Sequence, residues 1–180
     1  MIELYQIKNK NVYPIFKNGR SSVIEYADRN NVEPYSLGTY NSCQNVTVYI
    51  REPFERFVSG VHSFIEWSRL DNPKLDDNTC LWMIEKGKLV DEHFTQQWHW
   101  IKNLAKYYKN NITLEPVSNL YSLIPDRYQP AGKHIPKITF VEEQKIKQIK
   151  FDLSKDYNIW NNYLNTTHNI KEFIDVLSKN

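Results

Sequence analysis

The stretch KNGRSS, residues 17–22, places a lysine, a glycine and two hydroxyls where a strand pattern gives way to a helical pattern. Backbone N–H groups at the start of a helix are unpaired, and the helix dipole adds positive potential there. Lys17 supplies a compact positive charge, and Gly19 lets the backbone approach a ligand closely. Both serines can donate from their hydroxyls. The stretch predicts a loop that binds phosphate or sulfate, and the alternative is a solvated turn with a serine N-cap.

A second stretch, REPFERFVSG at residues 51–60, follows the clearest strand of the chain. Arg51 ends that strand, Pro53 suits the first turn of a helix, and Arg56 and Ser59 share one helical face. An arginine at a strand end and a serine about two turns into the next helix can hold one phosphate from two sides. The alternative is that the charged residues of this stretch form surface ion pairs.

Together the two stretches resemble the sulfotransferases that use 3′-phosphoadenosine 5′-phosphosulfate (PAPS). That family has a loop of the form (P)KxGxT/S after its first strand and a later motif of the form RxPxxRxxSxx. KNGRSS and REPFERFVSG match both, in the same order and the same strand–helix contexts. DEHFTQQW, residues 91–98, is similar to a His-aromatic-x-x-Gln segment of the carbohydrate sulfotransferases. Two departures are Phe16, where the family usually has proline, and Arg20, where it often has a small residue.

The resemblance implies transfer of a sulfuryl group from PAPS to an acceptor hydroxyl or amine, with a carbohydrate acceptor favoured and adenosine 3′,5′-bisphosphate as the product. It implies that Arg51 and Ser59 hold the 3′-phosphate, with Lys133 or Lys137 reaching it from a basic loop. Lys17 stabilises the leaving oxygen, and no metal is required. The residues implied to hold the 5′-phosphosulfate are Lys17, Asn18, Gly19, Arg20, Ser21 and Ser22.

Such a transfer needs a base for the acceptor proton. His93, in the segment 91–98, is the first candidate because histidine titrates near neutral pH. The alternative for His93 is a role as a helix cap or as an exposed side chain. Glu33 is the second candidate, because some members of the family place a glutamate base near the second strand.

Apolar periodicity predicts the elements that must position these residues. Strands are expected at 12–16, 34–40, 45–52 and 112–116, and helices at 21–30, 53–69, 79–87, 95–108, twice within 142–163, and at 170–178. Alternating strands and helices predict an α/β fold: a three-layer P-loop-type fold with a short, mainly parallel sheet flanked by helices, in a single domain over residues 1–180. Ligands bind such sheets at the carboxyl ends of the strands.

The composition argues against several classes of protein. The chain has 180 residues and a net charge of +2, too small to indicate bulk binding of nucleic acid. Two cysteines, Cys43 and Cys80, do not form a CxxC pair, which argues against a zinc site or a disulfide scaffold. No apolar run is long enough for a signal peptide or a membrane span. We expect a cytoplasmic protein with no nucleic-acid or membrane partner.

Two other functions remain open from the sequence. A P-loop nucleotide kinase or NTPase would need a complete GxxxxGK[ST] motif and an acidic magnesium ligand at a strand end. Here the lysine comes first in the loop, and the strand that ends at Ile50 is followed by Arg51. A non-catalytic module of the same fold, binding a nucleotide or a sulfated glycan, is the other alternative.

Overall fold

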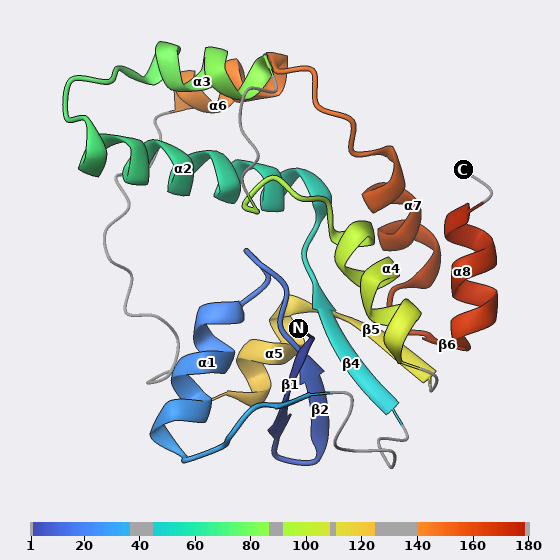
Figure 1. Cartoon of the computed structure of the whole chain (residues 1–180). Helices are drawn as coiled ribbons and strands as arrows, with labels where there is room; N and C mark the ends of the chain where they lie inside the picture. Colours follow the sequence, from blue (N-terminus) through green and yellow to red (C-terminus); the bar gives the residue numbers. More distant parts are fainter. Residues whose placement is uncertain (1, 37–44, 87–91, 109–110, 125–139, 179–180) are drawn as a thin grey trace.

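The computed structural model describes residues 2–36, 45–86, 92–108, 111–124 and 140–178. Within them lie six strands and eight helices (Figure 1). The strands are β1 (Glu3–Ile7), β2 (Lys10–Tyr13), β3 (Tyr35–Ser36), β4 (Asn45–Ile50), β5 (Asn111–Pro116) and β6 (Thr167–His168). The helices are α1 (Arg20–Arg29), α2 (Pro53–Asp71), α3 (Asp77–Glu85), α4 (Gln97–Tyr107), α5 (Val117–Leu123), α6 (Phe140–Gln148), α7 (Ser154–Tyr163) and α8 (Ile170–Ser178).

The strands form one mixed sheet in the order β3-β1-β2-β4-β5-β6. The three central strands β2, β4 and β5 are parallel, whereas β1, β3 and β6 pair in antiparallel fashion. The α/β class is confirmed, and the sheet is mixed: its centre is parallel, as expected of a mainly parallel sheet, but its outer strands are not. The amino-terminal hairpin is one reason: Ile7 pairs with Lys10 across a two-residue turn, and Lys8 has the positive φ of 53° that such turns favour.

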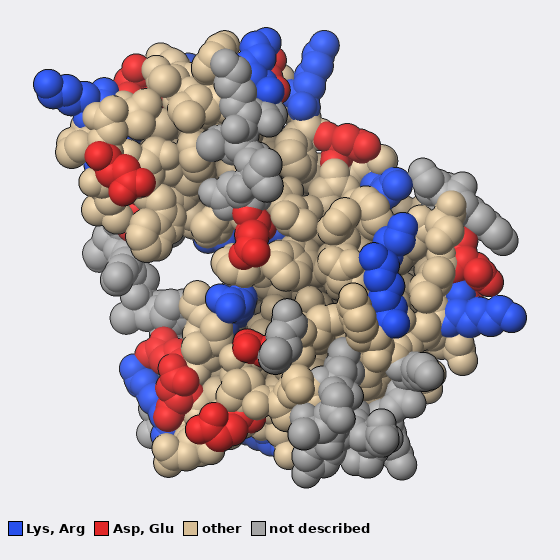
Figure 2. Space-filling view, in the orientation of Figure 1, with Lys and Arg blue, Asp and Glu red and all other residues tan. Residues whose placement is uncertain are grey.

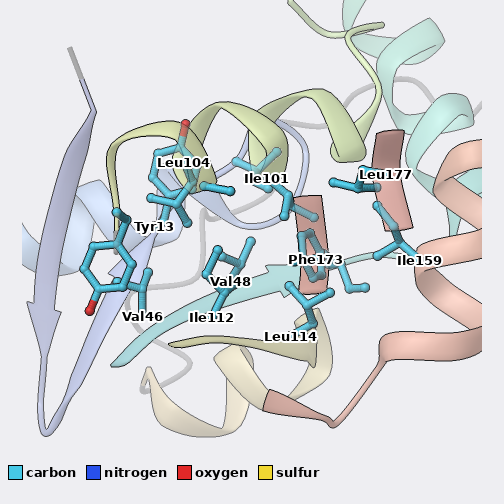
Figure 3. Close-up of a cluster of buried hydrophobic side chains, with 14 of the residues drawn as sticks. Tyr13, Val46, Val48, Ile101, Leu104, Ile112, Leu114, Ile159, Phe173 and Leu177 are labelled. Atoms are coloured by element: carbon cyan, nitrogen blue, oxygen red, sulfur yellow. The ribbon is translucent and has the colours of Figure 1, made fainter. Parts of the chain in front are cut away.

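Helices cover both faces of this sheet. Val23 and Ala27 of α1 and Leu120 of α5 pack with β1, β2 and β4 on one face. On the other face, a cluster from α4, α7 and α8 packs against the alternate side chains of β4 and β5 (Figure 3). The alternation of side chains along β4 explains the division, because Val46 and Val48 pack on the second face and Tyr49 packs on the first. The predicted flanking by helices is therefore confirmed.

A further helical layer lies beyond the carboxyl ends of the parallel strands. It consists of α2, α3 and α6, which lie side by side away from the sheet (Figure 1). Its core is aromatic, and the rings of Phe57 and Phe151 stack with their centroids 4.6 Å apart. Pro53 opens α2 as predicted, and Glu52 caps that helix by accepting from the N–H of Glu55. No described helix combines the length and the apolar character needed to cross a membrane.

Candidate anion-binding site

The loop between β2 and α1, residues 14–19, lies at the carboxyl edge of the sheet. Lys17 and Gly19 both have positive φ, 65° and 83°. Left-handed residues that alternate with others turn successive backbone N–H groups toward one side, which is the geometry of an anion-binding concavity. Helix α1 starts directly after Gly19, and this N-cap residue has no side chain with which to cap the first N–H groups. This loop is therefore suited to an anion, as the sequence predicts.

Asn18 holds the loop from inside. Its side chain is 2% exposed, and its Nδ2 donates to the carbonyl of Tyr49 at 3.0 Å and to Oε1 of Gln97 at 2.6 Å. Its backbone N–H donates to the carbonyl of Ile15 at 3.1 Å. Both kinds of donor on Asn18 are thus engaged by the protein itself. The residue predicted to bind the phosphosulfate instead ties the loop to β4 and α4.

Gly19 is required by packing against α5. A Cβ on this residue would lie 2.5 Å from Cδ2 of Leu120, closer than any ordinary contact. The positive φ adds a second reason for glycine. The sequence suggests glycine for close approach of a ligand, and the structure adds that α5 already occupies the space beside this residue.

Helix α2 fixes the other side of the loop. The Nζ of Lys17 donates to Oγ of Ser63, and the Nε of Arg56 donates to the carbonyl of Phe16 at 3.2 Å. Arg56, Gly60 and Ser63 recur at helical spacing and are all buried. Ser63 is a residue that the sequence reading misses, although its spacing from Arg56 was the available signal.

Arg56 is a buried cation beside the loop. The side chain is 3% exposed, and burial lowers the pKa of its guanidinium to about 10, with Asp156 opposing the shift. Its Nη2 is buried without a hydrogen-bond partner among the described residues. Arg56 therefore adds positive potential in a poorly solvated region next to Lys17.

The first turn of α1 presents three side chains with different surroundings. Ser21 is exposed, whereas Ser22 is fully buried and its Oγ has no hydrogen-bond partner among the described residues. The Arg20 guanidinium lies over the ring of Phe16, 4.5 Å from the centroid. Phe16 and Arg20, the two departures from the family pattern, thus contact each other.

The second predicted motif lies at the end of the neighbouring strand. Arg51 follows β4, is partly buried, and donates from Nη2 to the hydroxyl of Tyr121 on α5 at 3.3 Å. Its backbone N–H donates to Oε1 of Gln97 and its carbonyl accepts from Nε2 of Gln97, both at 2.9 Å. Ser59 is partly buried in the second turn of α2, which begins two residues after Arg51. Tyr121 and Gln97 are contacts that the sequence reading misses.

The two candidate bases lie in different places. The ring of His93 meets the ring of Phe16 edge-on, with centroids 5.8 Å apart, and the His93 carbonyl lies against Gly60. His93 is therefore beside the loop. Glu33 is exposed and follows the carboxyl end of α1, so a helix of 10 residues, about 15 Å long, separates it from the loop. Lys137 and Lys133 lie outside the described residues.

The molecule is hollowed between the layer of α2, α3 and α6 and the body that contains α1 and the sheet (Figure 2). Basic and acidic side chains both reach the rim of this hollow. No group of three or more His, Cys, Asp or Glu residues suited to a metal ion occurs within the described ranges. Comparisons with protein-family models, curated proteins and solved structures found no match.

Proposed function

We propose that this protein is a sulfotransferase that uses PAPS. The supporting observation is that the two anion motifs lie at the carboxyl ends of adjacent parallel strands, β2 and β4, and are joined through Gln97. Ligands of α/β sheets bind at this edge. The strand–loop–helix formed by β2, residues 14–19 and α1 supports the P-loop-type part of the proposed fold.

The residues present fit the two anionic ends of such a donor. Lys17, the N–H groups at the start of α1 and the Oγ of Ser22, which has no hydrogen-bond partner in the described part of the chain, would hold the 5′-phosphosulfate. Arg51 and Ser59 would hold the 3′-phosphate, which distinguishes PAPS from ATP. Arg56 would strengthen both contacts through its buried positive charge.

When bound, PAPS supplies a sulfuryl group attached through a bridging oxygen to the 5′-phosphate, and this oxygen leaves as part of adenosine 3′,5′-bisphosphate. In the transfer, a bond forms between sulfur and the acceptor oxygen while the bond to the bridging oxygen breaks. Lys17 would meet the negative charge that grows on the leaving oxygen, and His93 would take the proton from the acceptor hydroxyl. The chemistry parallels phosphoryl transfer, in which positioning and charge stabilisation supply most of the catalysis.

A carbohydrate acceptor is the part of this proposal that rests on the segment 91–98. His93 comes from that segment and lies against Phe16, so the segment borders the loop. Glycans from a panel of unsulfated polysaccharides, offered with labelled PAPS, would test this class. Incorporation that is lost in Lys17→Ala is the expected result, whereas a bound donor with no transfer would favour a non-catalytic module.

The decisive experiment is calorimetric titration with adenosine 3′,5′-bisphosphate, beside ATP and AMP. Arg51→Ala should abolish tight binding of the bisphosphate. Arg69→Ala is the matched control, because Arg69 lies near the other end of α2 and pairs with Asp77. Equal binding of ATP, or no binding of the bisphosphate, would overturn the proposal and favour an NTPase or a different ligand.

A further inference from the structure

Gln97, the first residue of α4, contacts both anion motifs at once. It is 1% exposed, and its Oε1 accepts from Nδ2 of Asn18 at 2.6 Å and from the N–H of Arg51 at 2.9 Å. Its Nε2 donates to the carbonyl of Arg51 at 2.9 Å. One amide group from a third element therefore joins the loop to the end of β4.

The backbone of Gln97 is itself held in place. Asp156 on α7 is 1% exposed and accepts from the N–H groups of Gln97 and Trp98, each at 2.9 Å. Helix α4 has no side-chain cap of its own at Gln96. Asp156 therefore supplies the cap from another helix, with its carboxylate at the positive end of α4. Asp156 therefore holds in place the backbone from which the joining amide extends.

We infer that Gln97 is a positioning residue that fixes the spacing between the loop at Lys17 and the strand end at Arg51. This inference rests on the proposed function. A ligand with two anionic groups binds most tightly when the free protein already holds the two motifs at the right spacing. Otherwise part of the binding free energy is spent on ordering one motif relative to the other. A ligand with one anionic group needs no such spacing.

The test compares three ligands on two variants. Gln97→Met removes the joining amide while keeping an unbranched side chain. Gln96→Met is the matched control, since Gln96 is the adjacent residue and bonds to the carbonyl of Asp152 and to Trp98. The ligands are adenosine 3′,5′-bisphosphate, adenosine 5′-phosphate and adenosine 3′-phosphate, each titrated by calorimetry.

Gln97→Met should lower the affinity for the bisphosphate by about tenfold or more, and the affinity for each monophosphate by about threefold or less. Gln96→Met should leave the ratio between the bisphosphate and the monophosphates unchanged. An equal loss for all three ligands in Gln97→Met would overturn the inference, because a general loss of stability or of one contact has that signature.

A ligand-free measurement separates this inference from the proposed function. Amide hydrogen exchange should become faster at residues 16–20 and 50–52 together in Gln97→Met, and in neither segment in Gln96→Met. Asn18→Leu serves as a second variant if Gln97→Met does not fold, because it breaks the same bridge from the loop side. Unchanged exchange would overturn the inference whatever the ligand. If exchange becomes faster in both segments but the protein binds no bisphosphate, the positioning role of Gln97 stands and only the proposed ligand is wrong.

Discussion

The conformation of the anion loop depends on two residues with positive φ. Glycine adopts the left-handed region freely, whereas a lysine there costs about 1 kcal/mol or more. Lys17 is held in that region by Ser63 and by the neighbouring carbonyl contact of Arg56. The loop therefore stores backbone strain next to the charge that the proposed chemistry uses.

Gly19→Ala should lower the free energy of unfolding by about 1 to 3 kcal/mol, because the new Cβ is strained at this φ and meets Leu120. Urea unfolding measures the change. Ser21→Ala, two residues further on and exposed, is the control and should change stability by less than about 0.5 kcal/mol. A fully stable Gly19→Ala protein would show that the loop can adopt another conformation at no cost.

Arg56→Met should weaken anion binding more than it weakens the fold. Burying the guanidinium costs solvation free energy, and the substitution removes that cost along with the hydrogen bond to the Phe16 carbonyl. Because the two effects oppose each other, the free energy of unfolding should change by about 1 kcal/mol or less. Affinity for adenosine 3′,5′-bisphosphate should fall by about tenfold, because a charge in a poorly solvated region is weakly screened. Arg29→Met, exposed at the far end of α1, should leave the affinity unchanged. A large loss of stability with normal affinity would contradict the electrostatic role.

Among the secondary-structure elements, β6 joins the sheet to α8 through one buried histidine. His168 packs edge-on against Tyr163, tilts against Phe173, and contacts the hydroxyl of Thr166. Burial lowers the pKa of His168 below its ordinary value of 6.5, with Glu172 opposing the shift. The folded protein thus binds this proton less tightly than the unfolded chain does.

The stabilising contribution of His168 should therefore be complete above about pH 6.5 and decline as the pH falls through that value. His168→Phe removes this dependence. Measured by urea unfolding at about pH 7.5 and about pH 5, the free energy of unfolding of wild type should fall relative to that of His168→Phe at the lower pH. A difference that does not change with pH for His168→Phe would refute the linkage.

The sequence predicts the strongly periodic elements well and the short ones poorly. The parallel strands β4 and β5 and most helices are found because their apolar spacing is clear. Strand β2 is misplaced: it spans Lys10–Tyr13 and shares only residues 12 and 13 with the predicted strand at 12–16. The hairpin strand β1 and the helix α5 are missed, because five and seven residues give too short a pattern for a clear period. Strand β6 has only two residues, which is too short for any periodic signal.

In the candidate site, the sequence predicts residues that belong to a local pattern but not the contacts between residues far apart in the chain. Local patterns predict the positions of Lys17 and Arg51 at strand ends. Their contacts with Ser63, Tyr121 and Gln97 join residues 46 or 70 positions apart, which no local pattern reports. The sequence therefore indicates where an anion could bind but not what holds its binding groups in place.

For the entire protein, donor binding should stabilise the fold by mass action. Adenosine 3′,5′-bisphosphate at about one hundred times its dissociation constant should add about 2.7 kcal/mol, which corresponds to a rise in Tm of about 5 to 10 °C for a chain of this length. Lys17→Ala and Arg51→Ala should abolish the rise in a thermal unfolding assay. An equal rise with ATP would contradict selection for the 3′-phosphate.

The bridge at Gln97 also has a consequence for the order of folding. Asn18 meets Gln97 across 79 positions, and Gln97 meets Asp156 across a further 59. Closing such long loops is slow and comes late, because chain entropy is lost before the contacts form. During synthesis the loop at Lys17 therefore leaves the ribosome well before the carboxylate of Asp156, which anchors its support. A nascent chain would carry the anion motifs without their shared anchor until α7 has emerged.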